Sequence, residues 1–401
     1  MFWNVSLAGS FVLPVLNFPP GMDFSLSDHQ LLIRDTVRDF MNSEVRPHVK
    51  DWERTDHFPL DAIRKLGALG CCGMLMPEEW GGPGLDTISY VLMLEEVARV
   101  HTALSTALGV TNSAVQLPLL AHGTQAQKER YLRGLASGEI IGAFCLTEAA
   151  AGSDAAGIQC SAVHVGDSYK LNGTKTWVTN GSAAGVYIVF AKTDLVAAGK
   201  GITAFLVEPA SPGFKIGRHE DKMGQRSSPS VELLLTDCIV PTENRLGDEG
   251  AGLKIALAAL DGGRIGIAAQ AVGLAQGALD ESVKYARARK AFGKSIGEFQ
   301  AIQWMLADMH TEIEAARGLL YQAAFLKDSA GKIGSAASRA KLYASEMVNR
   351  VVYKAVQIHG SLGYSRESEV ERMYRDARVI SIYEGTSEIQ RTIIARDLLG
   401  R

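Results

Sequence analysis

The spacing of apolar residues changes character twice along this chain. Residues 27–139 place apolar side chains such as Leu32 and Val37 at helical intervals. From about 140 the pattern becomes short β-branched and aromatic runs separated by Gly, Pro, Asp and Asn, including 187–190, 204–207 and 231–235. After about 250, long Ala-rich helical stretches return. We therefore predict an α+β protein with an all-α domain over residues 22–139, a small β domain over 140–250 and an α-helical domain over 251–401.

Composition limits the class of protein. With 401 residues and 47% hydrophobic content, the chain can bury a large core and form two or three domains. A formal net charge of −3, with Lys and Arg scattered, gives no electrostatic footprint for nucleic acid. Five cysteines without a C-x-x-C pair predict reduced thiols in a cytosol-like compartment, and the nine histidines show no metal-ligand spacing. We expect a globular protein with no nucleic-acid partner and no metal.

Residues 1–21 form an apolar segment without Lys or Arg. This composition argues against a mitochondrial transit peptide and leaves a signal peptide without its basic region. Pro14, Pro19 and Pro20 interrupt a run already shorter than the roughly 20 residues that cross a bilayer. We expect an extension outside the fold, which starts near Met22, no membrane span, and a location in the bacterial cytoplasm.

The stretch 382–390 carries the strongest chemical signal. Glu384 lies between Tyr383 and Gly385, directly before a helix start. An apolar setting disfavours the charged carboxylate and raises its pKa, which suits a general base that works near neutral pH. Ser387 and Gln390 match a capping box whose free N–H groups could face an anionic cofactor. Taken alone, the pattern also fits a solvated glutamate before a helix.

Two segments of the predicted β domain could hold a flat, polar heterocycle. Residues 144–154 run from a strand into a turn of small and hydroxyl-bearing residues. Trp177 and Thr179 place an aromatic plate and a hydroxyl at the end of another strand, which suits stacking on a ring system. The usual phosphate loops are absent: no G-x-G-x-x-G follows a strand, and Ala288 stands where a P-loop ending at 293–295 needs its first glycine.

Together these segments resemble the acyl-CoA dehydrogenase family. The resemblance covers nearly all of Met22–Arg401, and its motifs occur in the family's order at Pro77–Asp86, Leu146–Asp154, Leu246–Leu253, Arg289–Gln300, Gln357–Gly360 and Tyr374–Gln390. It implies the family's fold, with a helical amino-terminal domain, a small β-barrel-like middle domain and a carboxy-terminal four-helix bundle.

The resemblance also implies a reaction, the α,β-dehydrogenation of an acyl-CoA thioester to the trans-2-enoyl-CoA with non-covalently bound FAD. Glu384 would remove the α-proton while the β-hydrogen leaves as hydride to flavin N5. The Glu384 N–H would help to polarise the thioester carbonyl, where one oriented donor contributes roughly 3–4 kcal/mol. Electrons would pass to an electron-transfer flavoprotein, and the subunits would form a homotetramer, a dimer of dimers.

Family positions carried over to this sequence define the predicted site residues. FAD contacts from one subunit would come from Phe144, Leu146, Thr147, Gly152, Ser153, Trp177, Val178 and Thr179. A neighbouring subunit would add Arg289, Phe292, Gln300, Gln357, Ile358, His359, Gly360 and Ser361. Beside the flavin would lie Thr386, Ser387 and Glu388. The acyl-CoA would contact Ser153, Asp261, Gly262, Gly263, Arg264 and Gly385.

One position bears on the branch of the family. Some members carry the base on the helix that holds Arg264, and here Gly263 occupies that position, which leaves Glu384 as the only family candidate. The chain looks most like short-chain and short-branched-chain members, which act in fatty acid β-oxidation and branched-chain amino acid catabolism. The length of the acyl tail depends on the cavity beside residues 103–115, and we expect a short tail.

The chain departs from the family pattern at a few positions, and two other functions stay open. Ala149 and Ala150 replace the usual Pro-Gly of the flavin signature, and Ser361 replaces a glycine. An acyl-CoA oxidase on the same fold would pass electrons to oxygen, although such oxidases commonly carry an additional carboxy-terminal domain. A non-catalytic FAD-binding assembly protein would keep the fold without the chemistry, and Glu384 argues against it.

Overall fold

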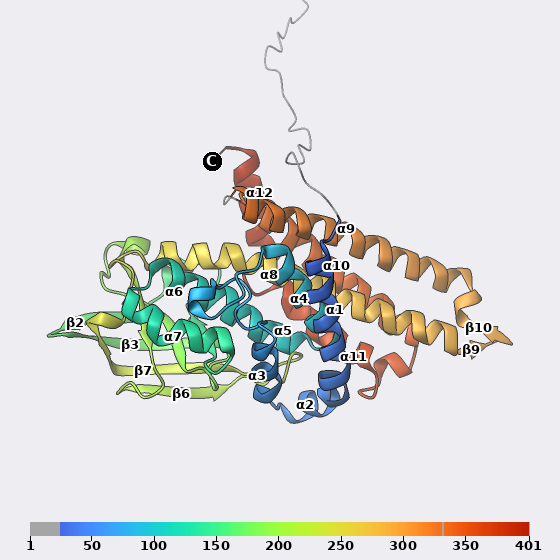
Figure 1. Ribbon diagram of the computed structural model, residues 1–401, viewed down its shortest axis with the longest axis horizontal. Helices are drawn as coiled ribbons and strands as arrows, with labels where there is room; N and C mark the ends of the chain where they lie inside the picture. The colour runs from blue at the N-terminus through green and yellow to red at the C-terminus, as the bar shows by residue number, and fades with distance from the viewer. Residues whose placement is uncertain (1–24, 331–332, 401) are drawn as a thin grey trace, which may run out of the picture.

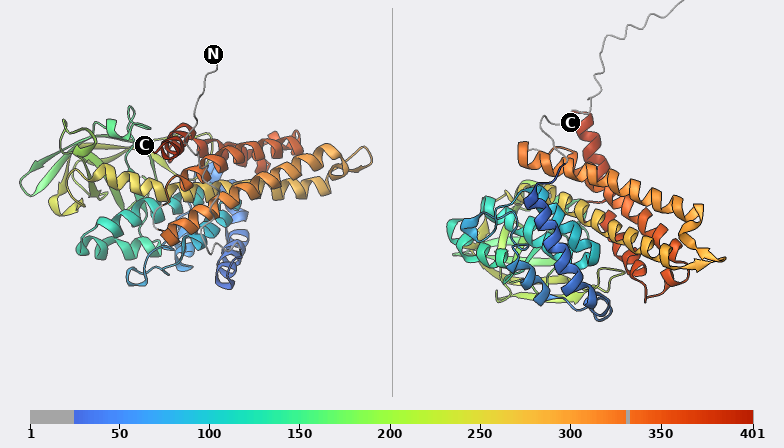
Figure 2. Two further views of the ribbon diagram at one scale, coloured as in Figure 1. Left: turned by 90° about the horizontal axis from the view of Figure 1, so that it is seen from above. Right: turned by 45° about the vertical axis from the view of Figure 1, so that its right-hand side comes forward.

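The computed structural model describes residues 25–330 and 333–400. Strands gather at one end of the molecule, and long helices extend from them to the β9–β10 hairpin at the opposite end (Figure 1). Two further views show the same elongated arrangement (Figure 2). The extension expected at residues 1–21 lies outside the described residues, so it stays a prediction.

The amino-terminal third is helical, as predicted. Ser27 opens it with a capping box to Gln30, and a 3₁₀ turn at Glu78–Trp80 separates two groups of helices. The α-helices are α1 (Asp28–Phe40), α2 (Val49–Thr55), α3 (Leu60–Ala68), α4 (Thr87–Val100), α5 (Thr102–Gly109), α6 (Leu117–His122) and α7 (Gln125–Ser137). Short π or 3₁₀ turns lie between them at Met41–Val45, Arg46–His48, Glu78–Trp80 and Val110–Gln116.

The middle region is an eight-stranded sheet that folds over its own core. Its hydrogen-bonded order is β6-β7-β3-β2-β4-β5-β8, and β1 pairs in parallel with β4. Apolar residues of β3, β4, β5 and β7 meet in one buried cluster, which agrees with the predicted small barrel-like domain. The strands are β1 (Gly142–Cys145), β2 (Ser161–Val165), β3 (Ser168–Thr179), β4 (Val186–Lys192), β5 (Ile202–Val207), β6 (Phe214–His219), β7 (Ser230–Pro241) and β8 (Arg245–Leu246).

The carboxy-terminal region is a bundle of long helices, as predicted. Helices α8, α9 and α10 pack on one another, and α11 and α12 pack on α10. The helices are α8 (Gly252–Ala288), α9 (Gln300–Ala330), α10 (Ala336–His359), α11 (Glu369–Ala377) and α12 (Ser387–Leu398). Between them lie β9 (Lys290–Ala291), β10 (Lys294–Ser295) and three 3₁₀ turns at Ile296–Glu298, Leu362–Tyr364 and Arg378–Ser381.

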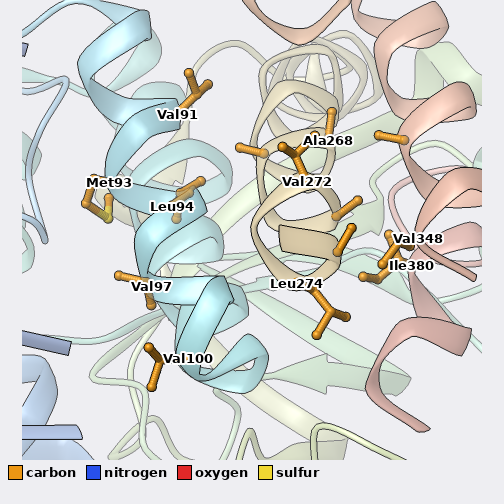
Figure 3. Close-up of a cluster of buried hydrophobic side chains, with 14 of the residues drawn as sticks. Val91, Met93, Leu94, Val97, Val100, Ala268, Val272, Leu274, Val348 and Ile380 are labelled. Carbon is orange, nitrogen blue, oxygen red and sulfur yellow. The ribbon is translucent and has the colours of Figure 1, made fainter. Parts of the chain in front are cut away.

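Helix α8 is the spine of the main core. Leu94 of α4 lies on the side of that helix that faces α8, and Val348 and Ile380 lie on the opposite side of α8 (Figure 3). By length and composition alone α8 could cross a membrane, but 72% of its most apolar 18-residue window is buried inside the protein. A helix that is apolar on most sides belongs in the interior, where its neighbours cover it. Its first half also forms one wall of the candidate active site.

Candidate active site

Glu384 lies in a tight turn between the 3₁₀ turn that ends at Ser381 and helix α12. Glu384 and Gly385 both adopt the left-handed backbone conformation, with φ of 55° and 88°. This conformation is uncommon for a residue other than glycine, so the surroundings must hold it. Gln390 Nε2 donates to the carbonyl oxygens of Glu384 and Gly385 at 3.2 and 2.9 Å, and Lys341 Nζ donates to the Gly385 oxygen at 2.7 Å. Two side chains therefore fix the turn.

The predicted capping box at this helix is wrong by one residue. Thr386 is the N-cap of α12, and its hydroxyl accepts from the Ile389 N–H at 3.4 Å. Ser387 is already the first helical residue, and its buried hydroxyl has no partner among the described residues. Thr and Ser are both good caps, so the sequence left the choice ambiguous. Because Thr386 is the N-cap, Gln390 lies one position too far along α12 to complete a capping box. Its side chain hydrogen-bonds to the carbonyl oxygens of the turn instead.

The carboxylate of Glu384 lies against Gly263 of α8. A Cβ atom placed on Gly263 would lie 2.7 Å from Glu384 Oε2 and 2.9 Å from both Cδ and Oε1. Any larger residue at position 263 would therefore displace the carboxylate. The two positions that the resemblance offers for the base open onto the same space, and in this chain the glycine on α8 leaves that space to Glu384.

Burial makes Glu384 a weak acid. Desolvation raises its pKa to about 7, although the charges of Arg264 and Lys341 act in the opposite direction. Its Oε2 atom is buried without a hydrogen-bond partner among the described residues. A carboxylate in this state can take a proton near neutral pH, because the protonated form is easily reached.

A ring of buried polar side chains lies beside the turn. Tyr383 donates to Gln270 Oε1 of α8, and Gln270 Nε2 donates to the Thr106 hydroxyl of α5. Thr106 donates to Gln225 Oε1 at 2.6 Å, and Gln225 Nε2 returns to the Tyr383 hydroxyl at 3.3 Å. Gln225 belongs to the loop between β6 and β7. The ring therefore joins the turn to α5, α8 and the β region and places polar groups in the space between α5 and α8.

The two predicted flavin-binding segments of the β region lie side by side. The Thr176 N–H donates to the Thr147 oxygen at 2.9 Å, and buried Lys175 donates to the Leu146 oxygen at 3.1 Å and to Glu148 at 2.7 Å. The pairing of β3 with β7 shifts register between Lys175 and Val178. The residues Phe144, Leu146, Thr147, Gly152, Ser153, Trp177, Val178 and Thr179 therefore belong to one neighbourhood.

That neighbourhood has the features that a flat ring system needs. Trp177 has a left-handed backbone, with φ of 58°, and its side chain is 58% exposed. The Thr176 hydroxyl is buried without a partner among the described residues, and a Cβ on Gly152 would meet nothing within 4 Å. An exposed aromatic face, an unpaired hydroxyl and an open backbone fit a bound flavin. Asn180, which follows Thr179, donates to the Ala107 oxygen of α5 at 3.1 Å and so connects this segment to the helix that also carries Thr106.

The second predicted group of cofactor residues lies elsewhere. At about 1.5 Å per helical residue, Gln357 lies about 24 Å along α10 from Lys341, which contacts the turn. Tyr285 of α8 stacks on His359 with ring centroids 4.3 Å apart, which places the end of α10 beside the end of α8 that leads into the hairpin. This group comprises Arg289, Phe292, Gln300, Gln357, Ile358, His359, Gly360 and Ser361. Within one chain, these residues do not meet the flavin-binding segments of the β region (Figure 1).

Of the predicted substrate residues on α8, Gly263 lies against Glu384 and Arg264 acts on its charge, whereas Gly262 faces Lys327 and Leu117. Ser153 lies in an exposed loop of the β region. Arg264 is buried and pairs with Asp261, and its Nε atom has no partner among the described residues. Sequence reasoning missed Lys341, Gln270 and Tyr90, whose buried hydroxyl would lie 3.0 Å from a Cβ on Gly266. A signal existed for Lys341, which falls on the buried stripe of α10 marked by Ala337, Ala344 and Val348.

Comparison with known proteins identifies the class. Family models match the chain in the same order as its three structural regions. They are the N-terminal domain of acyl-CoA dehydrogenase over residues 27–139, the middle domain over 143–238 and the C-terminal domain over 250–399. The chain belongs to the acyl-CoA dehydrogenase family and is an oxidoreductase that uses the family's cofactor, FAD.

Two relatives and one solved structure illustrate the similarity. The chain is 45% identical to the short-chain specific acyl-CoA dehydrogenase of Clostridium acetobutylicum, over 93% of this chain and 99% of that protein. It is also 45% identical to the CarC subunit of the caffeyl-CoA reductase-Etf complex of Acetobacterium woodii, over 93% and 99% of the two chains. Butyryl-CoA dehydrogenase from Megasphaera elsdenii superposes with a TM-score of 0.92 at 44% identity, covering 94% of this chain and 100% of that chain.

Proposed function

We propose that this protein oxidises a short-chain acyl-CoA to the trans-2-enoyl-CoA, with Glu384 as the base that removes the α-proton. The observation that supports this most directly is the raised pKa of Glu384, about 7, on a carboxylate seated against Gly263. At pH 7 roughly half of these side chains carry a charge, so a large fraction of the enzyme is ready to accept a proton. Bound FAD, held by residues such as Trp177 and Thr179, would supply the acceptor for the β-hydrogen, which leaves as hydride.

The backbone of the turn offers a second contribution. Among the described residues, the Glu384 N–H makes no hydrogen bond, so it is available to donate to the thioester carbonyl oxygen. Removal of the α-proton moves negative charge onto that oxygen, and one oriented donor stabilises such charge by roughly 3 kcal/mol. Gln390 and Lys341 keep the donor in place because they hold both carbonyls of the turn.

The cofactor is proposed to lie across two subunits. Trp177, Thr179 and the segment from Phe144 to Ser153 would hold it from one side, and Thr386, Ser387 and Glu388 would lie beside the flavin. Phe292 supports a contribution from a second chain, since it is 94% exposed at the hairpin end. An aromatic ring so exposed is typical of an interface or ligand contact. We propose a homotetramer, a dimer of dimers, in which the hairpin-end residues complete a neighbour's FAD site.

The substrate is proposed to carry a short acyl tail. Between α5 and α8, Gln270 and Thr106 are buried and hydrogen-bonded to each other. A long apolar tail that entered this space would strip both groups of their partners, at a cost of about 1–3 kcal/mol for each unsatisfied group. The name of the Clostridium acetobutylicum relative agrees with this choice. A specificity constant that rose steadily from four-carbon to twelve-carbon thioesters would contradict the proposal.

An electron-transfer flavoprotein is the proposed electron acceptor, as in the reductase complex named for the Acetobacterium woodii relative. Anaerobic titration with butyryl-CoA tests the function: bleaching of the flavin absorbance is expected, followed by fast reoxidation with an electron-transfer flavoprotein and slow reoxidation in air. Fast reoxidation in air would identify an oxidase, and no bleaching at all would leave the non-catalytic FAD-binding assembly protein. We expect the enzyme in the bacterial cytoplasm.

A further inference from the structure

Lys341 is a fully buried lysine in the middle of the bundle. Its side chain faces inward from α10, on the stripe that Ala337, Ala344 and Val348 share. Burying an ammonium group is unfavourable unless partners compensate for the lost water. Among the described residues no carboxylate lies within ion-pair distance of Lys341, and the hydrogen bond recorded for its Nζ atom goes to the Gly385 oxygen at 2.7 Å. A cation in such a position calls for an explanation.

The charged and titratable groups around Lys341 and Glu384 come from four helices and from the turn itself. Arg264 faces them from α8, Glu346 from α10, Glu388 from α12, the Tyr90 hydroxyl from α4 and the Tyr383 hydroxyl from the turn. Arg264 has its own carboxylate partner in Asp261, whereas Lys341 has none. Burial lowers the pKa of Lys341 to about 8, and Glu384 is the strongest of the charges that oppose this change. Near pH 7 Lys341 is therefore mostly protonated.

Lys341 and Gln390 approach the same oxygen with different chemistry. Both donate to the carbonyl of Gly385, at 2.7 and 2.9 Å, and both therefore hold the left-handed turn. Only Lys341 carries a charge. The chain thus contains a matched pair, in which one residue supplies geometry and the other supplies the same geometry together with a positive field.

We propose that Lys341 is a positioning residue for the base: through the Gly385 carbonyl it fixes the turn, and through its charge it favours the ionised form of Glu384. The inference rests on the proposed function, because it takes Glu384 as the base. It adds that burial alone would make Glu384 a still weaker acid, and that the buried ammonium group opposes this together with the larger effect of Arg264. An opposite charge a few ångströms from a carboxyl typically moves its pKa by one unit or more.

The test compares K341M with Q390L in the FAD-loaded protein. Each variant removes a donor to the Gly385 oxygen, and only K341M removes a charge. Anaerobic flavin reduction by butyryl-CoA is measured against pH, and the protonation of Glu384 is followed separately by infrared difference titration of the carboxyl band, with E384Q used to assign that band. K341M should move both midpoints upward by about one pH unit. Q390L should lower the limiting rate several-fold and leave both midpoints at the parent value, and K341R should restore the midpoint.

Two results would overturn the role of Lys341: K341M with the parent midpoint in both titrations, or Q390L with a midpoint raised as far as that of K341M. If K341M does not fold, K341Q serves in its place, with thermal unfolding and flavin content as checks. Failure of the proposed function is a separate result, because E384Q would then reduce its flavin at the parent rate whatever the Lys341 variants do.

Discussion

The turn at Glu384 and the hairpin end of the long helices differ in how far the residues of a single chain complete them. At the turn, Lys341 and Gln390 hold the backbone, and Gly263 receives the carboxylate. At the hairpin end, Phe292 is 94% exposed, and the Arg289 side chain makes no hydrogen bond or ion pair among the described residues. One chain therefore holds the proposed base with its own residues, while Arg289 and Phe292 of the other group of predicted cofactor residues face outward.

The largest expected effect is the loss of flavin reduction when Glu384 is replaced. Glu384→Gln keeps the size and hydrogen-bonding capacity of the side chain but cannot accept the α-proton. Flavin reduction by butyryl-CoA should fall by about 10²–10⁴-fold, the usual contribution of a general base. FAD content should stay unchanged, because the amide leaves the turn intact. Stopped-flow absorbance measures the rate, and a variant that keeps more than about a tenth of the parent rate would show that Glu384 is not the base.

A smaller loss is expected when the base is displaced without being removed. Gly263→Ala puts a Cβ within 2.7–2.9 Å of the carboxylate, and the end of a flexible side chain can move away without unfolding the helix. Misplacing a catalytic group by about 1 Å can cost about 10²-fold in rate, so we expect a loss of about 10–100-fold in a folded, FAD-loaded protein.

Gly262→Ala is the matched control for that substitution. Its Cβ would lie 3.6 Å from Lys327 Nζ and 3.8 Å from Leu117 Cδ1, which are ordinary contacts. Flavin reduction should fall less in this variant than in Gly263→Ala. Equal losses would mean that the added methyl group disturbs α8 itself and not the seat of the carboxylate.

At the outward-facing end the expected effect is on cofactor retention. Arg289→Ala should lower the ratio of flavin to protein several-fold after gel filtration, while the subunit stays folded, because the exposed side chain has no described partner to lose. Arg287→Ala, two residues earlier and equally exposed, should retain FAD. Light scattering gives the assembly state in both cases. A monomer with a full complement of FAD would contradict the two-subunit cofactor site.

The sequence indicated the turn at Glu384 but not the side chains that hold it in place. Glu384 is readable because its setting suits a buried base and because the other segments of the chain complete the family resemblance, and the three-part order follows from the spacing of apolar residues. Lys341 was missed because a lysine in an Ala-rich helix ordinarily lies at the surface, and its burial depends on packing between segments far apart in sequence. The cap of α12 was misplaced because adjacent Thr386 and Ser387 fit the same pattern.

The cofactor residues show a different limit. Spacing along the chain cannot tell that Gln357 and Phe144 lie in separate parts of one subunit, since that depends on the lengths and directions of α8 and α10. The family resemblance was the basis for assigning the group around Gln357 to a neighbouring subunit. The structure agrees with this assignment only because that group lies apart from the flavin-binding segments of the β region in one chain. The exact domain boundaries likewise stay predictions. Helices and strands end within a few residues of each predicted boundary, so they do not fix its exact position.

The last expected effect falls on stability and again separates the two regions. Glu384 has a folded-state pKa of about 7 against an ordinary 4.5, so the folded protein binds its proton more tightly than the unfolded chain does. This contribution is fully present below pH 4.5 and is lost as pH rises through 7, on the order of 1–3 kcal/mol. Glu384→Gln carries no charge at any pH and escapes the loss. Its thermal midpoint should therefore exceed the parent's by an amount that grows from pH 5 to pH 8, whereas any difference between Arg289→Ala and the parent should not vary with pH over this range. A constant difference for Glu384→Gln would show that burial does not raise the pKa of this carboxyl.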